Sequence, residues 1–185
     1  MRTKLLYALL LCLFLTAFSH AASIGTFGIK LDLNGDHEFS GPGGSADYDI
    51  VSGTGISLVL ESLVDQHTWA FGVGLEFCLP HEIDYDPGDP KFTFLPVYMI
   101  MSTDPDEVVS LAGYLGYNLS FSGNDDYDGG ADLSGGLFLG VGIGAYMDRF
   151  RIEVRYSMYE GDIDYGGGSV DVTHTELSLL VGLVF

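Results

Sequence analysis

The chain has 185 residues, with 26 acidic and seven basic side chains and a formal net charge of −19 at pH 7. So acidic a chain excludes nucleic acid as a partner, because phosphate recognition needs clustered Lys and Arg. Hydrophobic residues make up 47% of the chain and charged residues 18%, so a large apolar surface must be hidden from water. With two cysteines, a fold that depends on several disulfides is also excluded.

The N-terminal segment is predicted to be a secretory signal peptide. Arg2 and Lys4 precede the apolar run 5–18, which is too short to span a bilayer as a helix. Ser19 and Ala21 then occupy the small-residue positions of a cleavage site. A retained anchor helix is the alternative interpretation.

Cleavage after Ala21, or alternatively after Ala22, divides the chain into a signal peptide of residues 1–21 and a single domain of residues 22–185. Cys12 leaves with the signal, so Cys78 is alone and cannot form an intrachain disulfide. An exported domain of this size without disulfides must be held by burial or by a closed sheet.

Alternation of apolar and polar residues predicts eight strands in the remaining chain. The expected ranges are 24–34, 52–62, 68–79, 91–102, 108–121, 136–147, 149–159 and 175–185. In the fourth strand, Phe92, Phe94, Pro96, Tyr98 and Ile100 share one face. The other face of that strand is also apolar, so its facing stays open.

The connections alternate in length. Short turns are expected at 63–67, 103–107 and 148, and long Gly- and Asp-rich loops at 35–51, 80–90, 122–135 and 160–173. This alternation is typical of an up-and-down meander with an even number of strands. Strands of 10–12 residues tilted by about 40° rise roughly 25 Å, the height of the apolar band of a membrane barrel.

The less apolar strand faces decide between a soluble barrel and a membrane barrel. They carry charged residues together with many glycines, among them Gly72, Gly74, Gly140 and Gly142. On the outside of a lipocalin-like barrel in water, a row of glycines would only weaken the strands. Inside a narrow barrel they leave room for large side chains. We therefore expect an all-β, eight-stranded, antiparallel up-and-down transmembrane β-barrel, whose closure satisfies every backbone group in lipid.

The signal peptide, the eight alternating strands and the terminal Phe185, preceded at alternate positions by Leu183 and Val181, resemble the small outer-membrane barrels: the OmpA barrel domain, OmpX and the opacity-type porin-like surface proteins. The resemblance is one of pattern and covers the whole mature chain. It implies a bacterial outer-membrane location, contact with lipid and lipopolysaccharide, and a monomer. It also implies that Phe185 is a signal for the barrel-assembly machinery.

Six charged residues are expected to form a network in the lumen: Lys30, Glu76, Arg151, Glu153, Arg155 and Glu176. Arg155 should lie opposite or near Glu176, and Lys30 should approach the same carboxylates when the first strand closes on the last. Unpaired charges are costly in a narrow lumen, so mutual pairing is expected. The network is interpreted as a structural plug, with a small or gated ion path as the alternative.

The long loops hold sixteen acidic residues, and dense carboxylates suit calcium or magnesium. Weak surface candidates for these cations are Asp84, Asp86, Asp126, Asp128, Asp162 and Asp164. Residues 32–40 resemble a calcium loop only superficially, because His37 stands at the sixth position and Gly43 where a bidentate Glu is needed. We expect no cofactor beyond such weakly bound cations.

No enzyme is expected. His174 and Glu176 share one strand face, with Ser157 or Ser178 nearby, but no nucleophile motif surrounds them. The predicted function is an envelope-structural or surface-recognition role through acidic extracellular loops, with a ligand that the sequence does not name. A small cation-preferring channel is the alternative, and a lipid A-modifying enzyme is a third interpretation.

Overall fold

The computed structural model describes residues 23–49, 55–66, 68–82, 91–103, 108–122, 132–164 and 168–185. The expected signal peptide therefore lies outside the described residues. All the regular elements within these ranges are strands: β1 (Ser23–Gly41), β2 (Gly44–Asp49), β3 (Ile56–Asp65), β4 (Trp69–Cys78), β5 (His81–Glu82), β6 (Lys91–Thr103), β7 (Val109–Ser122), β8 (Asp132–Met147), β9 (Phe150–Asp164) and β10 (Ser169–Val184). No helix in this part of the chain is long and apolar enough to cross a membrane.

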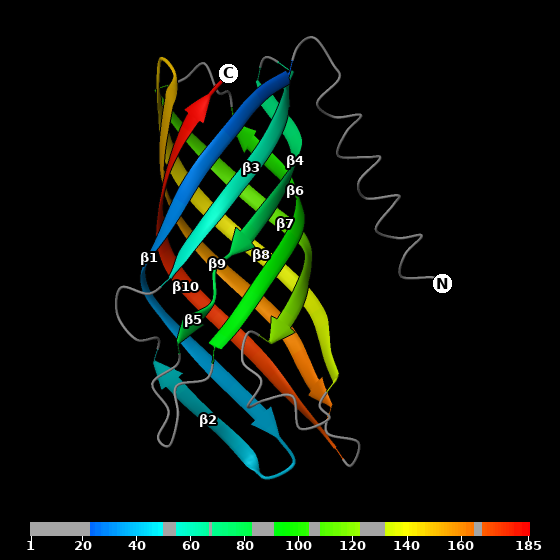
Figure 1. Ribbon diagram of the computed structural model, residues 1–185. Helices are drawn as coiled ribbons and strands as arrows, with labels where there is room; N and C mark the ends of the chain where they lie inside the picture. Colours follow the sequence, from blue (N-terminus) through cyan, green and yellow to red (C-terminus); the bar gives the residue numbers. More distant parts are fainter. Residues whose placement is uncertain are drawn as a thin grey trace.

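Eight of these strands close into a barrel (Figure 1). The barrel strands are, in chain order, β1, β3, β4, β6, β7, β8, β9 and β10. Each pairs antiparallel with the one that follows it, and the last, β10, pairs antiparallel with β1 to complete the ring. The short strands β2 and β5 add to the edges of β1 and β6. The predicted eight-stranded antiparallel up-and-down barrel is confirmed.

The C-terminal residue takes part in this closure. The Gly25 amide donates to the Phe185 carbonyl at 2.9 Å, and the Phe185 amide donates back to Gly25 at 3.0 Å. At the same end of the barrel, β8 and β9 are joined by the tight turn Asp148–Arg149, in which Asp148 has a φ of 53°. Aspartate tolerates this left-handed conformation better than most residues do.

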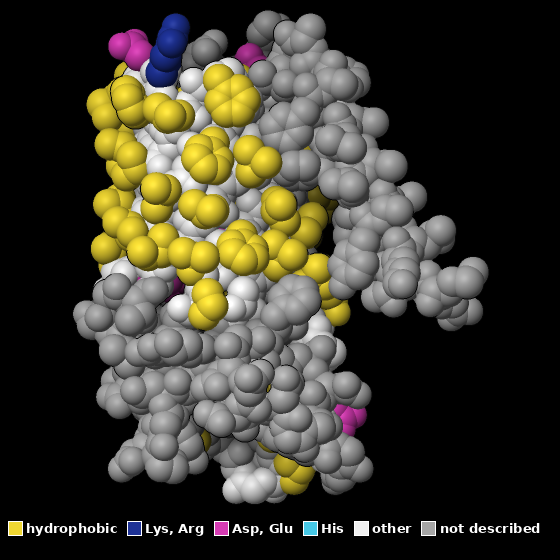
Figure 2. Space-filling view, viewed as in Figure 1, with side chains coloured by type: hydrophobic (Ala, Val, Ile, Leu, Met, Phe, Trp, Pro, Cys, Tyr) yellow, Lys and Arg dark blue, Asp and Glu magenta, His cyan; other side chains and the backbone are white. Residues whose placement is uncertain are grey.

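The barrel exterior is apolar, as lipid requires. Phe27, Ile29 and Leu31 on β1, like Val181 and Leu183 on β10, are 43–51% exposed. Figure 2 shows hydrophobic side chains gathered in a band on the visible face of the barrel, in the half nearer the short turns. The interior-facing neighbours Lys30 and Leu180 are fully buried, so the predicted direction of both strands is correct.

Glycines inside the barrel make room for large side chains. A Cβ added to Gly74 would lie 2.1 Å from the Tyr98 ring, and one added to Gly142 would lie 2.7 Å from the Glu153 carboxyl group. Phe138 is one of the large side chains inside the barrel and is fully buried. The barrel is thus packed by pairing a missing side chain on one strand with a large one on its neighbour.

The structure fixes the facing of the fourth barrel strand, β6, which the sequence leaves open. Phe94, Tyr98 and Ile100 are each 2% exposed and point inward, whereas Met99 is 61% exposed and Met101 49%. The inward set supplies the aromatic filling of the lumen. Methionine, with its flexible and apolar side chain, serves equally well against lipid, so hydrophobicity alone could not separate the two faces.

Two of the predicted loops are largely strand. β1 continues to Gly41, and the chain then folds back as β2. β9 continues to Asp164, and β10 begins already at Ser169. With the start of β8, these segments form a sheet beyond the apolar band, here called the outer extension: β2, β1 35–41, β10 169–175, β9 160–164 and β8 132–135. The acidic residues expected on loops 35–51 and 160–173 are therefore mostly held on strands.

In β1 and β8 the alternation of buried and exposed residues shifts by one position where the strand continues into the outer extension, whereas β9 and β10 keep one alternation throughout. In β1, Thr26, Gly28 and Lys30 point inward, but after a bulge at Asp32/Asn34 the inward residues are Gly35 and His37. A second bulge lies in β8 between Gly135 and Phe138. Beyond the bulges, His37, Ile163, Val172 and His174 are buried, and Asp36, Glu38, Asp47, Asp162, Asp164 and Asp171 are exposed on the outer face. The outer extension is apolar inside and acidic outside, as in a sheet that faces water.

The boundary between these two regimes can be measured by placing the same charge on either side of it. Val141→Arg puts a cation on the lipid-facing wall of β8, where we expect destabilisation by about 2–4 kcal/mol. Ser134→Arg, on the exposed outer extension of the same strand, should change stability by less than about 1 kcal/mol. Urea unfolding in lipid vesicles measures both free energies, and equal effects at the two sites would contradict the placement of the boundary.

Candidate functional site

The lumen holds a buried ion-pair network, and its inner half is built around two arginines of β9. Arg151 pairs with Glu61 and with Glu153. The Arg155 Nη2 atom lies 2.8 Å from Glu61, and its Nε atom lies 2.8 Å from Glu153. All four side chains are buried, so each charge has exchanged its water for opposite charges on its own or a facing strand.

Tyrosine hydroxyls complete the hydrogen bonding of this half. Tyr98 donates to Glu61 at 2.8 Å, and Tyr114 donates to Glu153 at 2.7 Å. The Arg155 guanidinium carbon lies 3.9 Å from the centre of the Tyr114 ring, a distance that permits a cation–π interaction.

The outer half of the network joins the first and last strands. Lys30 on β1 pairs with Glu176 on β10 and lies 2.5 Å from Glu76 on β4. The Tyr159 hydroxyl is within hydrogen-bonding distance of both carboxylates, at 2.9 Å from Glu76 and 2.6 Å from Glu176. Arg155 lies 3.6 Å from the second Glu76 oxygen and so connects the two halves.

The lumen network is defined here as Lys30, Glu61, Glu76, Tyr98, Tyr114, Arg151, Glu153, Arg155, Tyr159 and Glu176. It contains every one of the six residues expected in the lumen. The expected approach of Arg155 to Glu176 is replaced by a different pairing: Arg155 stands opposite Ser178 in the β9–β10 register and binds Glu61, Glu76 and Glu153, while Lys30 takes Glu176.

Four members of the lumen network were missed in the sequence: Glu61, Tyr98, Tyr114 and Tyr159. Glu61 alternates with Leu58 and Leu60 in the pattern that predicts β3, and Tyr114 alternates with Leu111 and Leu115 in β7, so both were identifiable as inward residues. Tyr98 was lost with the facing of β6. Glu61 and Tyr114 could have been found because each is a polar residue on the inward face of its strand. The sequence analysis did not search the inward faces in that way.

Two imidazoles lie above the lumen network, on the inward face of the outer extension. His37 and His174 are directly opposite in the β1–β10 register, and their ring centres are 4.2 Å apart. His174 bonds the Asp36 carbonyl at 3.1 Å and lies 3.4 Å from a Glu176 oxygen. Ser178, weighed above as a partner of His174, donates instead to the Arg155 carbonyl at 3.2 Å.

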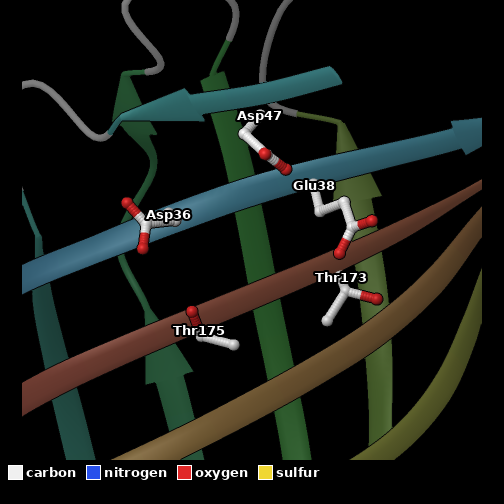
Figure 3. A pocket seen from close by; sticks show the side chains of 5 residues that line it. All are labelled: Asp36, Glu38, Asp47, Thr173 and Thr175. Carbon is white, nitrogen blue, oxygen red and sulfur yellow. The ribbon is translucent and has the colours of Figure 1, made fainter. Parts of the chain in front are cut away.

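The outer wall carries a second candidate site, the acidic groove: Asp36, Glu38, Asp47, Thr173 and Thr175 (Figure 3). These side chains, from β1, β2 and β10, line a surface pocket of about 410 Å³. In the register Asp36 faces Thr175, and Glu38 faces both Thr173 and Asp47. Three carboxylates beside two hydroxyls form an anionic surface that favours cationic groups.

The six aspartates predicted as weak cation-binding candidates are not brought together by the described part of the structure. Asp84, Asp86, Asp126 and Asp128 lie outside the described residues. Asp162 and Asp164 are exposed on β9, and Asp162 accepts a hydrogen bond from Ser134 at 3.1 Å. No group of three or more His, Cys, Asp or Glu side chains within the described ranges is arranged to hold a metal ion.

The contribution of the lumen network to stability can be measured by replacing Lys30. Lys30→Met removes the cation between Glu76 and Glu176, and the uncompensated carboxylates should lower the free energy of unfolding by about 3–5 kcal/mol. Adding Glu176→Gln should recover part of that loss, since one of the two buried negative charges is then gone. Urea unfolding in detergent micelles checks both values. If Lys30→Met alone is as stable as the wild type, the ion pairs of Lys30 contribute nothing to the free energy of unfolding.

No protein-family model and no curated protein matches the sequence. Solved structures do. Neisserial surface protein A is 18% identical and matches with a TM-score of 0.52 over 89% of this chain and 98% of its own. Ail of Yersinia pestis is 17% identical, with a TM-score of 0.51 over 88% and 99%. The outer membrane protein OprG of Pseudomonas aeruginosa is 18% identical, with a TM-score of 0.50 over 89% and 96%. The chain shares the fold of these small eight-stranded outer-membrane barrels.

Proposed function

We propose that this protein is a non-enzymatic outer-membrane barrel that acts in surface recognition, with a closed lumen as scaffold and the acidic groove as the contact region. The observation that carries the proposal is the change in the outward residues of β1, β9 and β10, which are apolar in the band and acidic in the outer extension. Beyond the apolar band the outer wall turns acidic on ordered strands rather than on loops. A rigid sheet presents charges in a fixed pattern, and fixed charges recognise a partner at lower entropic cost than mobile ones.

Three independent features support a location in the bacterial outer membrane. The export signal predicted in residues 1–21, the apolar exterior band and the shared fold of solved outer-membrane proteins all favour the bacterial outer membrane. Outer-membrane lipid and lipopolysaccharide would then surround the barrel. Phe185, hydrogen-bonded into the closing strand pair, would serve the barrel-assembly machinery as the terminal signal.

The partner of the acidic groove is expected to be cationic. Asp36, Glu38 and Asp47 are all exposed, and the chain carries a net charge of −19. Ail has been solved in complex with sucrose octasulfate, a heparin analogue, which is a polyanion. The charge on this barrel favours the opposite class of ligand, such as a protein or peptide surface rich in Lys and Arg.

A short oligolysine peptide provides the test. It should bind the folded barrel at low salt and lose affinity as salt rises, because the contacts are solvent-exposed. Asp36→Asn/Glu38→Gln/Asp47→Asn should weaken binding by about ten-fold, measured by fluorescence anisotropy in micelles. The control Asp162→Asn/Asp164→Asn/Asp171→Asn removes the same charge from another part of the outer extension. Equal losses in both variants would mean that net charge, rather than the acidic groove, attracts the peptide.

The alternative is a small cation-preferring channel, and one observation favours it. The lumen network sets four carboxylates, Glu61, Glu76, Glu153 and Glu176, against three cations, so its formal charge is negative. Against conduction stands the density of the filling, since these side chains are buried and bonded across the lumen. Ions would have to displace ion pairs in order to pass.

Planar-bilayer recording separates the two functions. The closed scaffold predicts no steady unitary current at neutral pH. The channel predicts cation-selective steps that shrink when Glu76 or Glu176 is replaced by Gln, because the favourable field in the lumen is weakened. Such steps, sensitive to these two substitutions, would overturn the proposal of a closed lumen.

A further inference from the structure

The C-terminal ring lies over a glycine of the first strand. Gly25 belongs to the outward row of β1 together with Phe27 and Ile29, yet Gly25 is buried, whereas those two side chains are 47% and 48% exposed. A Cβ added to Gly25 would lie 2.5–2.9 Å from the Cε2, Cζ and Cδ2 atoms of Phe185. The Phe185 ring thus fills the space that the side chain of any other residue at position 25 would need.

We propose that Gly25 is the docking position of the terminal ring, and that the docked Phe185 ring holds closed the inner end of the seam, which is the antiparallel pairing of β1 with β10. Two backbone hydrogen bonds already join the two residues: Gly25 donates to the Phe185 carbonyl at 2.9 Å, and Phe185 donates to Gly25 at 3.0 Å. The ring adds a side-chain contact on the outer side of the wall. The backbone and the side chain of the last residue therefore hold the same partner.

The end of β10 is held on two sides. Chain termini usually fray, because few contacts hold their last residues. Here the Val184 amide donates to the Arg149 carbonyl at 2.8 Å, next to β9, while Phe185 pairs with Gly25 on β1. Phe185 is 70% exposed, so its ring covers Gly25 with one face and leaves the other face exposed. Hydrogen bonds at the end of a strand open at low free energy when few side chains pack over them, and the terminal ring supplies that packing.

Glycine is the residue that this contact requires. The methyl group of an alanine would stand closer than 3.0 Å to the ring, so the ring would have to turn away. It can do so without disturbing the barrel, because it is the far end of a flexible side chain and is largely exposed. Glycine within a strand weakens the strand, and an aromatic ring laid across the glycine offsets that loss. Gly74 and Tyr98 form such a pair inside the barrel, and Gly25 and Phe185 form one on its outer surface.

Loss of the ring contact should loosen only the inner end of the seam. β1 is also paired with β3, beginning at Ser23 and Val64, so β1 stays in the sheet when the ring is absent. Further along the seam, Ile29 faces Val181, away from the terminal ring. Because a free strand edge pairs readily with other chains, a seam that is held closed at its end also favours the monomer.

Hydrogen exchange at the amides of residues 25 and 185, followed by NMR in micelles and corrected for intrinsic rates, tests the ring contact. Gly25→Ala displaces the ring and Phe185→Ala removes it, so both variants should exchange about ten-fold faster than the wild type at these two amides. Because the two changes break the same contact, the double variant should exchange no faster than either single variant. The amides of Ile29 and Val181 should keep their protection in all three variants.

Gly113→Ala is the matched control. Gly113 also lies on the outward face of a strand, β7, but a Cβ added there would meet no atom within 4 Å. Exchange at residues 25 and 185 should therefore equal that of the wild type. Equal acceleration in Gly113→Ala and Gly25→Ala would overturn the proposal, as would a Gly25→Ala variant that exchanges at the wild-type rate. A double variant whose acceleration is the product of the two single effects would show that Gly25 and Phe185 act independently, which also contradicts the proposal.

The position of the ring gives a second readout. In the wild type, nuclear Overhauser effects should connect the ring protons of Phe185 with the α-protons of Gly25, and their absence would overturn the proposal. In Gly25→Ala the effects between the ring and residue 25 should disappear. All proteins are refolded from urea into micelles, so that none depends on the proposed assembly signal, and gel mobility before and after boiling verifies folding. If Phe185→Ala does not refold, Phe185→Leu replaces it, because leucine keeps an apolar side chain without a flat ring.

Discussion

Lipid offers no hydrogen-bond partner to a backbone amide or carbonyl, and the rest of this molecule follows from that constraint. The sheet must close, which it does where β10 meets β1. The outside must be apolar, so the polar side chains that a strand inevitably carries turn inward. In a ring of eight strands the interior is narrow, and charges there meet one another rather than water. Closure of the backbone thus dictates the lumen network of side chains.

The same constraint explains how much of the fold the sequence revealed. Strict alternation is enforced wherever one strand face meets lipid, so the strand number, the closed barrel and the six lumen charges were predictable from spacing. The facing of β6 was not, because Met99 and Met101 on one side and Phe94 and Ile100 on the other are all apolar. There the choice depends on volume: the Tyr98 ring fits against Gly74 of the neighbouring strand, a relation between strands that no single segment contains.

The acidic segments were misassigned for a different physical reason. Beyond the apolar band a sheet faces water, so its acids turn outward and its apolar residues inward, the opposite of the rule that applies in lipid. A one-residue bulge at Asp32/Asn34 accomplishes the change in β1. If the rule for lipid, with apolar residues outward, is applied to the whole chain, residues 35–41 and 169–175 show no strand pattern and resemble loops. Asp36 and Glu38 of the acidic groove and the paired His37 and His174 lie on these segments, so the candidate sites were less predictable than the barrel that supports them.

The longest-range contact of the lumen network bears on how such a barrel is made. Lys30 and Glu176 are separated by 146 residues, because one lies on the first strand and the other on the last. Until those strands meet, a buried ammonium group and two buried carboxylates lack each other, and a half-built sheet must keep its interior open to solvent. Completion of the ring and expulsion of water are therefore coupled in one late step. A chain in which β1 and β10 have not yet paired therefore lacks this ion pair.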